Sequence, residues 1–260
     1  MREVAMSLSA FGLSVDYIVE QLLGIPGFVL FLCFRGFCEA WTALKLGDNT
    51  AYLNGYLTMN PKKHINPIGF IFLIVFGFGF SNPVPTNSRN YKHIKRDNAI
   101  QILSAPLSGV VLMALACFAL YLFWFIGFRF NLVMQPLPVL YFGSGYTILR
   151  AAAASAGTFA VLYNALLCIL AQTAVVSIFL AVFFLLPLPG FDGYRLIANF
   201  LPYRYYSALY RIEKYNMYIF IVFILLLNFV PGFYNIVSVP ASAVLNGANF
   251  IFTKLLLLVL

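Results

Sequence analysis

Two long stretches of this sequence, 99–128 and 151–186, contain no charged residue. Each is longer than the roughly 20 residues that an α-helix needs to cross the hydrocarbon core of a bilayer. The composition agrees: 62% of the residues are hydrophobic and 9% are charged, against about 45–50% and about 25% in a soluble domain. The sequence therefore excludes an ordinary soluble domain, a disordered chain and a coiled coil. It predicts a polytopic membrane protein of roughly four to six spans.

The remaining segments complete this pattern. A first span lies within 19–46, and the segment 47–66 that follows is polar, with β-branched, aromatic and turn-forming residues typical of short strands or an irregular loop. The apolar run 68–80 is short for a full span and suits a re-entrant element. Segment 217–230 is expected to be a further span, and 241–260 either spans or lies at the surface.

The charges predict the topology. The net charge is +8, and basic residues flank the short run 68–80 on both sides. Basic residues are enriched in cytoplasmic loops, so we expect these loops in the cytoplasm and the short run to enter and leave on that side. The same clusters are expected to touch membrane lipids, whose anionic headgroups attract them. This topology accounts for the positive charge, and no nucleic-acid partner is expected.

Several motifs then carry a family resemblance. The sequence reads LGD at 46–48, LTMNPKKHINPIG at 57–69, NPVPTNSRN at 82–90, KRD at 95–97 and PLPGFDG at 187–193. In this order they resemble the site-2 protease family of intramembrane zinc metalloproteases, in its short bacterial form. The resemblance covers about 20–200. It implies an all-α polytopic fold in a bacterial cell membrane, with a small β element and a re-entrant segment after the first span. We expect a single membrane domain over 1–260, with C-terminal apolar segments at 201–260.

The resemblance also implies a chemistry. Active family members carry an HExxH helix, in which two histidines one turn apart bind zinc and the glutamate is the general base. An aspartate in the later motif supplies the third ligand, and Asp192 of PLPGFDG matches it. The metal acidifies a bound water, which attacks a peptide bond.

This sequence departs from that pattern at the metal site. Arg35 stands at the first histidine, Gly36 at the general base and Glu39 at the second histidine. Arginine has no lone pair for a metal and glycine has no side chain to accept a proton. Phe184 and Gly109 also replace polar residues that family members have near the substrate groove. We therefore predict no catalytic residue, no metal ligand and no cofactor in this chain.

The charged residues left at the site need another explanation. Arg35 and Glu39 are four residues apart on one helix, and the family fold directs Asp192 at the same face. We predict that Arg35, Glu39 and Asp192 form a structural ion cluster in place of zinc, with a charge of −1 unless burial protonates a carboxyl. In one alternative, Arg35 and Glu39 extend to the membrane interface without meeting Asp192. In another, Glu39, Asp192 and His64 form a rebuilt metal site.

The motif loop containing Asn60, Pro61 and His64 provides a structural role for that histidine, which can hydrogen-bond backbone groups there. The function that the resemblance implies is that of an inactive family member, which binds or scaffolds transmembrane segments of other proteins. An active zinc-dependent intramembrane metalloprotease with an atypical site is the alternative. A small transporter would require polar residues on facing spans, and the sequence has few.

Overall fold

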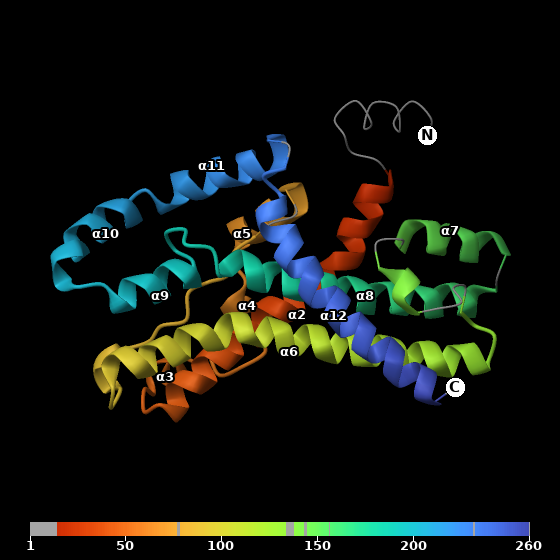
Figure 1. The fold of residues 1–260 in the computed structure, drawn as a ribbon, viewed down its shortest axis with the longest axis horizontal. Coiled ribbons are helices and arrows are strands. Elements are labelled where there is room, and N and C mark those ends of the chain that lie inside the picture. Colours follow the sequence, from red (N-terminus) through yellow and green to blue (C-terminus); the bar gives the residue numbers. More distant parts are fainter. Residues whose placement is uncertain are drawn as a thin grey trace. The chain divides into compact units, whose positions relative to one another are not determined.

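The protein is described here from a computed structural model that covers residues 15–76, 79–133, 138–142, 145–155, 157–230 and 232–259. Figure 1 shows these residues as a chain of helices. The α-helices are α2 (Val15–Lys45), α3 (Thr50–Leu53), α4 (Pro61–His64), α5 (Pro67–Phe76), α6 (Ile94–Arg129), α7 (Gly145–Ser155), α8 (Thr158–Phe184), α9 (Asp192–Phe200), α10 (Tyr206–Glu213), α11 (Asn216–Phe229) and α12 (Asn235–Val259). Short 3-10 turns lie at Ser88–Asn90, Pro138–Tyr141 and Tyr203–Tyr205.

Four helices are long and apolar enough to cross a membrane, at Val19–Lys45, Ile94–Arg129, Thr158–Phe184 and Asn235–Leu257. The predicted all-α polytopic architecture is confirmed to this extent. The expected span 151–186 is divided between α7 and α8, which end at Ser155 and begin at Thr158, and the chain is not helical at Gly157. Helix α11 has 14 residues, which is shorter than a typical span.

The predicted small β element after the first span is wrong. Segment 47–66 forms the two short helices α3 and α4, and within the described residues no strand occurs there. Local sequence favours this outcome, because Pro61 occupies the first turn of α4 and the side chain of Asn60 accepts a hydrogen bond from the Lys62 backbone N–H. Pro61 cannot donate to a β-ladder, which weakens the strand alternative.

The segment around α5 turns back on itself. Ile65 and Ser81 form an isolated antiparallel bridge, so the two ends of the intervening chain lie side by side. The backbone of Phe80 comes so close to Gly69 that a Cβ there would lie 2.2 Å from the Phe80 carbonyl oxygen. A re-entrant path requires such a return, and whether the segment enters a bilayer stays a prediction.

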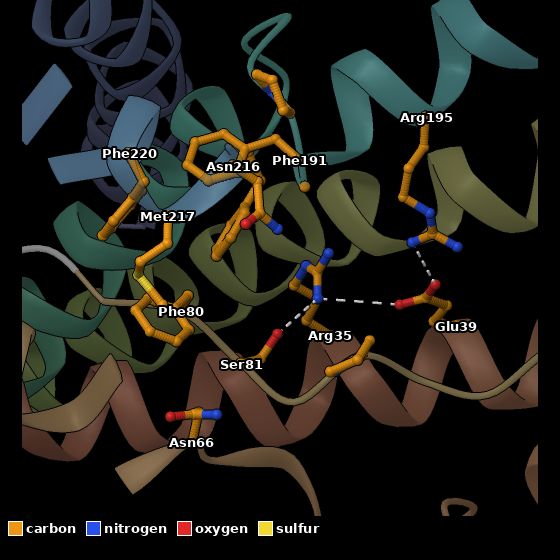
Figure 2. A pocket seen from close by; sticks show the side chains of 14 residues that line it. Arg35, Glu39, Asn66, Phe80, Ser81, Phe191, Arg195, Asn216, Met217 and Phe220 are labelled. Atoms are coloured by element: carbon orange, nitrogen blue, oxygen red, sulfur yellow. Dashed lines mark hydrogen bonds and ion pairs between the residues drawn. The ribbon is translucent and has the colours of Figure 1, made fainter. Parts of the chain in front are cut away.

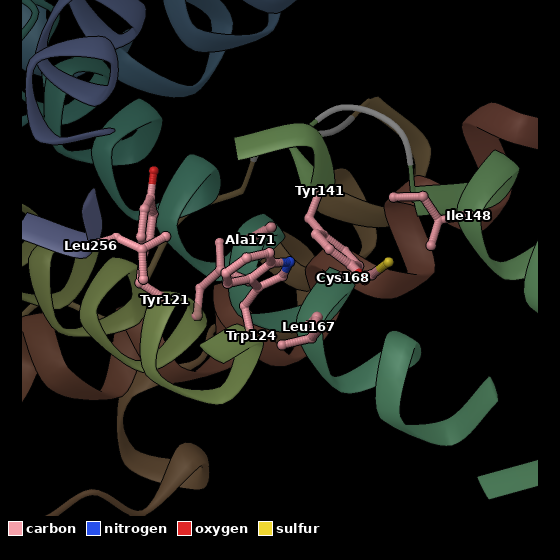
Figure 3. Close-up of a cluster of buried hydrophobic side chains, with 9 residues drawn as sticks. Tyr121, Trp124, Tyr141, Ile148, Leu167, Cys168, Ala171 and Leu256 are labelled. Atoms are coloured by element: carbon pink, nitrogen blue, oxygen red, sulfur yellow. The ribbon is translucent and has the colours of Figure 1, made fainter. Parts of the chain in front are cut away.

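The chain divides into two compact units, which we describe separately. One comprises the described residues of Met1–Phe28, Met113–Val176 and Val244–Leu260. Its core is a cluster of buried side chains around Trp124, shown in Figure 3. The cluster consists of Leu120, Tyr121, Trp124, Tyr141, Ile148, Leu167, Cys168, Ala171 and Leu256. It joins α6, α7, α8 and α12, so burial of apolar surface holds this unit together.

The other unit comprises Val29–Leu112 and Ser177–Ala243 and contains every predicted site residue. Within it, α2, α6 and α8 approach closely at Gly109. A Cβ at Gly109 would lie 2.7 Å from Ala181 and 2.8 Å from Phe31. The absence of a side chain at Gly109 therefore lets these three helices pack together.

Asp48 joins the two polar loops of this second unit. Its side chain is fully buried and accepts hydrogen bonds from the backbone N–H groups of Thr50 and Asn87 and from the side chain of Asn90. Burial by itself would raise the pKa of Asp48, but the hydrogen bonds to Thr50, Asn87 and Asn90 hold that pKa below its ordinary value. The carboxylate is thus a fixed link between the chain after α2 and the chain before α6.

We predict that Asp48→Asn lowers the free energy of unfolding by about 2 kcal/mol at pH 7, because an amide N–H₂ would face the Asn87 donor. Since the pKa of Asp48 is depressed, its stabilisation is present above the unfolded pKa of about 4 and is lost as pH falls through the folded value. Unfolding in detergent, followed by tryptophan fluorescence, should show a difference between wild type and variant that shrinks below about pH 4. A difference that is independent of pH would contradict this account.

Candidate functional site

Arg35 and Asp192 meet in the interior of the second unit. Arg35 lies on α2 and Asp192 begins α9, and the two residues are 5% and 1% exposed. The Nη2 group of Arg35 donates to both carboxylate oxygens of Asp192, at 2.6 and 2.7 Å. The alternative in which Arg35 extends to the membrane interface therefore does not describe this structure. Charge-assisted bonds of this length are the stronger class of protein hydrogen bond.

Glu39 lies one turn after Arg35 and has partners of its own. Its Oε1 atom accepts from Gln101 Nε2 at 2.7 Å and from Arg195 Nη1 at 2.9 Å. Its Oε2 atom lies 3.9 Å from Arg35 Nη1, so the direct Arg35–Glu39 ion pair is the loosest contact of the group. Arg195 Nη1 also lies 3.4 Å from Asp192 Oδ1.

We call these four charged residues, Arg35, Glu39, Asp192 and Arg195, the ion cluster. Two guanidinium groups face two carboxylates, so the formal charge of the cluster is zero rather than the predicted −1. A buried charge is costly unless it is paired. Arg195 is the residue that balances the second carboxylate.

Figure 2 shows Arg35 between Glu39 and Ser81, with Arg195 reaching Glu39 from α9. Arg35 Nη1 donates to Ser81 Oγ at 3.0 Å, and the guanidinium carbon lies 4.5 Å from the centroid of the Phe184 ring. Cation–π contacts of this kind stabilise a desolvated arginine. The aromatic residue at position 184 thus has a defined partner in the cation at position 35.

His64 occupies the space beside Gly36. A Cβ at Gly36 would lie 2.1 Å from His64 Nδ1, so no larger side chain fits without displacing the ring. The imidazole is fully buried and its Nε2 lies 2.7 Å from the Thr58 carbonyl oxygen, which makes Nε2 the donor in a neutral ring. Within the described part of the chain Nδ1 has no hydrogen-bond partner.

The motif loop holds this ring in place. Asn60 and Pro61 start the short helix α4, and His64 ends it. The ring of Tyr56 packs edge-on against His64, with 5.8 Å between the centroids. Burial lowers the pKa of His64, although the Thr58 carbonyl and the Glu39 carboxylate act in the opposite direction. The imidazole is therefore neutral at pH 7.

The donor set does not suit zinc. Zinc needs three or four deprotonated protein ligands around one point. Here both oxygens of Asp192 accept from Arg35, and Glu39 accepts from Gln101 and Arg195. Among the residues that the structure describes, no group of three or more His, Cys, Asp or Glu side chains could hold a metal, which includes the set Glu39, Asp192 and His64.

Comparisons with known proteins place the chain in a family. It is 32% identical over 184 residues to a Bacillus subtilis protein named "Putative zinc metalloprotease YwhC", and the match covers 71% of each chain. The chain belongs to the site-2 protease family. A Mycolicibacterium smegmatis protein named "Putative zinc metalloprotease Rip2" is 30% identical over 115 residues, which cover 42% of this chain and 44% of that protein. No family model and no solved structure matches the chain.

Family membership, together with four helices that can cross a membrane, identifies an integral membrane protein. Of the site residues considered from sequence, the structure brings Arg35, Glu39 and Asp192 together and packs His64 against Gly36. Sequence reasoning missed Arg195 and Gln101. Arg195 could have been found from its spacing, because it lies three residues after Asp192 on the same helix. Gln101 lies on α6, far along the sequence from both carboxylates, and carries no such signal.

We predict that Arg35→Leu lowers the free energy of unfolding by about 3 kcal/mol, because two buried carboxylates would share one cation. Thermal unfolding in detergent, followed by tryptophan fluorescence, measures the loss. The matched control is Arg129→Leu, which removes an exposed arginine at the end of α6. Equal stability of the Arg35 variant and wild type would contradict a structural role for the ion cluster.

We also predict that Gly36→Ala costs about 1–3 kcal/mol, because the new methyl group would overlap the His64 ring. In a His64→Ala background the same substitution should cost much less, which gives a large coupling energy in a double-mutant cycle. Gly247→Ala is the matched control, since a Cβ at that helical glycine meets no atom within 4 Å. Additive effects of the Gly36 and His64 substitutions would show that the two residues do not constrain each other.

Proposed function

We propose that this chain is a catalytically inactive member of the site-2 protease family, which binds apolar segments of membrane proteins without cutting them. The observation that carries the proposal is the hydrogen bonding of Asp192. Asp192 matches the family's third zinc ligand, and here both of its carboxylate oxygens accept from Arg35. A guanidinium stays protonated at every physiological pH, so it does not bind a metal. For the same reason, no change of pH in this range deprotonates Arg35 and releases the oxygens of Asp192.

The loss of the general base supports the same conclusion. Gly36 offers no proton acceptor, and the ring of His64 fills the space that a longer side chain would need. Placing Glu at position 36 would therefore displace His64, so restoring HExxH at positions 35, 36 and 39 would not by itself rebuild the site. The zinc-dependent mechanism of the family has no base and no ligand set in this arrangement.

A cavity beside the ion cluster provides room for a bound segment. It has a volume of about 330 Å³, within the range of small ligand sites. Arg35, Glu39, Ser81 and Arg195 line one part of it. Phe80, Met217 and Phe220 lie together at another part, as Figure 2 shows.

This lining suits the chemistry of an unwound apolar peptide. The charges of the ion cluster balance, so the polar end offers donors and acceptors without a net attraction for ions. A backbone amide carries one donor and one acceptor, and burying it is costly unless both are paired. The aromatic end of the cavity would take the apolar side chain next to such an amide.

The test uses the full chain in lipid nanodiscs and a synthetic apolar transmembrane peptide with a central Asn-Pro break. We predict that this peptide binds, as measured by fluorescence transfer, and stays uncut, as measured by mass spectrometry. Asn216→Trp would fill the cavity and weaken binding by about tenfold. The control Tyr218→Trp changes an exposed residue of the same helix that does not line this cavity.

Two results would overturn the proposal. Cleavage of the peptide that a zinc chelator abolishes would show the alternative, an active metalloprotease with an atypical site. Equal binding by wild type and Asn216→Trp, or no binding at all, would show that the cavity does not hold an apolar segment.

A further inference from the structure

A strongly cationic surface lies apart from the ion cluster, on the two loops that Asp48 joins. The first loop carries Lys45, Lys62 and Lys63, and the second loop with the start of α6 carries Arg89, Lys92, Lys95 and Arg96. All seven side chains are exposed. The site chemistry described above uses none of them.

The carboxylates of this region do not neutralise the surface. Between positions 41 and 100 the sequence has two acidic residues, Asp48 and Asp97. Both are buried, at 0% and 6% exposure. Asp48 accepts from Thr50, Asn87 and Asn90, and Asp97 accepts from the backbone N–H of His93. The exposed charge of these loops is therefore positive throughout.

Asp48 also joins the two loops that carry these cations. It binds the backbone of Asn87 at 2.6 Å and the side chain of Asn90 at 2.8 Å, so the loop after α2 is fixed to the loop before α6. Gly47 assists this approach, with a φ of +106° and the Asn90 carbonyl 3.4 Å from where its Cβ would be. The two loops thus form one surface.

The surface lies at the ends of two candidate membrane spans. One span ends at Lys45 and the next begins at Ile94, with Lys95 and Arg96 in its first turn. Because the two loops are bonded to each other, we expect these ends on the same side of a bilayer, near its headgroups. Lysine and arginine at that level attract anionic lipids within a Debye length.

We propose that this two-loop cationic surface binds the phosphate headgroups of anionic phospholipids in the surrounding bilayer. It acts by charge, with several exposed ammonium and guanidinium groups facing a plane of phosphodiesters. The interaction is independent of whether the site at Arg35 cuts peptide bonds. It would hold the two joined loops against the membrane surface.

The test compares spin-labelled phosphatidylglycerol and phosphatidylcholine around the full chain in vesicles. We expect the wild type to prefer phosphatidylglycerol by at least about fivefold in relative association constant, and to lose the preference at high salt. Combining Lys62→Gln, Lys63→Gln, Lys92→Gln and Lys95→Gln should bring the ratio close to one. The control removes three exposed cations of the other unit, with Arg129→Gln, Arg150→Gln and Lys254→Gln, and should keep most of the preference.

A preference for phosphatidylglycerol that survives in the quadruple variant would overturn the proposal, because the preference would then come from residues outside this surface. The proposal would also be overturned if the control lost the preference to the same extent as the quadruple variant. Soluble glycerophosphate, added at millimolar concentration, should not displace the lipid, since a single phosphate lacks the many contacts of a bilayer. Displacement would show that the surface binds free phosphate groups instead.

Discussion

The buried contact between Arg35 and Asp192 is the constraint on which the rest of the site depends. It joins α2 to α9 through charge-assisted hydrogen bonds of 2.6 and 2.7 Å. A guanidinium in this interior needs balanced charge and polar partners. Arg195, Gln101, Ser81 and the Phe184 ring provide them around Arg35 and Glu39. The buried Arg35 thus has charged, polar and aromatic neighbours that match it.

Gly36 and His64 show the same mutual fit at the next residue of α2. Gly36 has no side chain, and the His64 imidazole lies so close to it that even a methyl group would not fit. The ring is neutral because burial lowers its pKa, although the Thr58 carbonyl that accepts from Nε2 acts in the opposite direction. Two adjacent residues of α2, Arg35 and Gly36, therefore each have a structural counterpart elsewhere in the chain.

Much of this could be predicted from the sequence, because long uncharged runs specify membrane helices and ordered motifs specify the family. The convergence of Arg35, Glu39 and Asp192 followed from matching their positions to the family's ligands. The local structure of 47–66 is harder to predict, because its β-branched and aromatic residues favour strands, whereas Asn60 and Pro61 start a helix. The contacts of Gln101 and Arg195 with Glu39 depend on how α6 and α9 pack. The close fit of His64 against Gly36 depends on how closely α2 and α4 approach each other. Such contacts come from tertiary packing, which has no periodic signature in a sequence.

The most direct test of the central claim is the zinc content of the purified chain after incubation with excess zinc and removal of unbound metal. Elemental analysis should find far less than one zinc ion per chain, because Arg35 occupies the oxygens of Asp192 that a metal would need. One tightly bound zinc ion per chain, lost in Asp192→Asn, would contradict the account and would place this protein among the metal-binding members of its family.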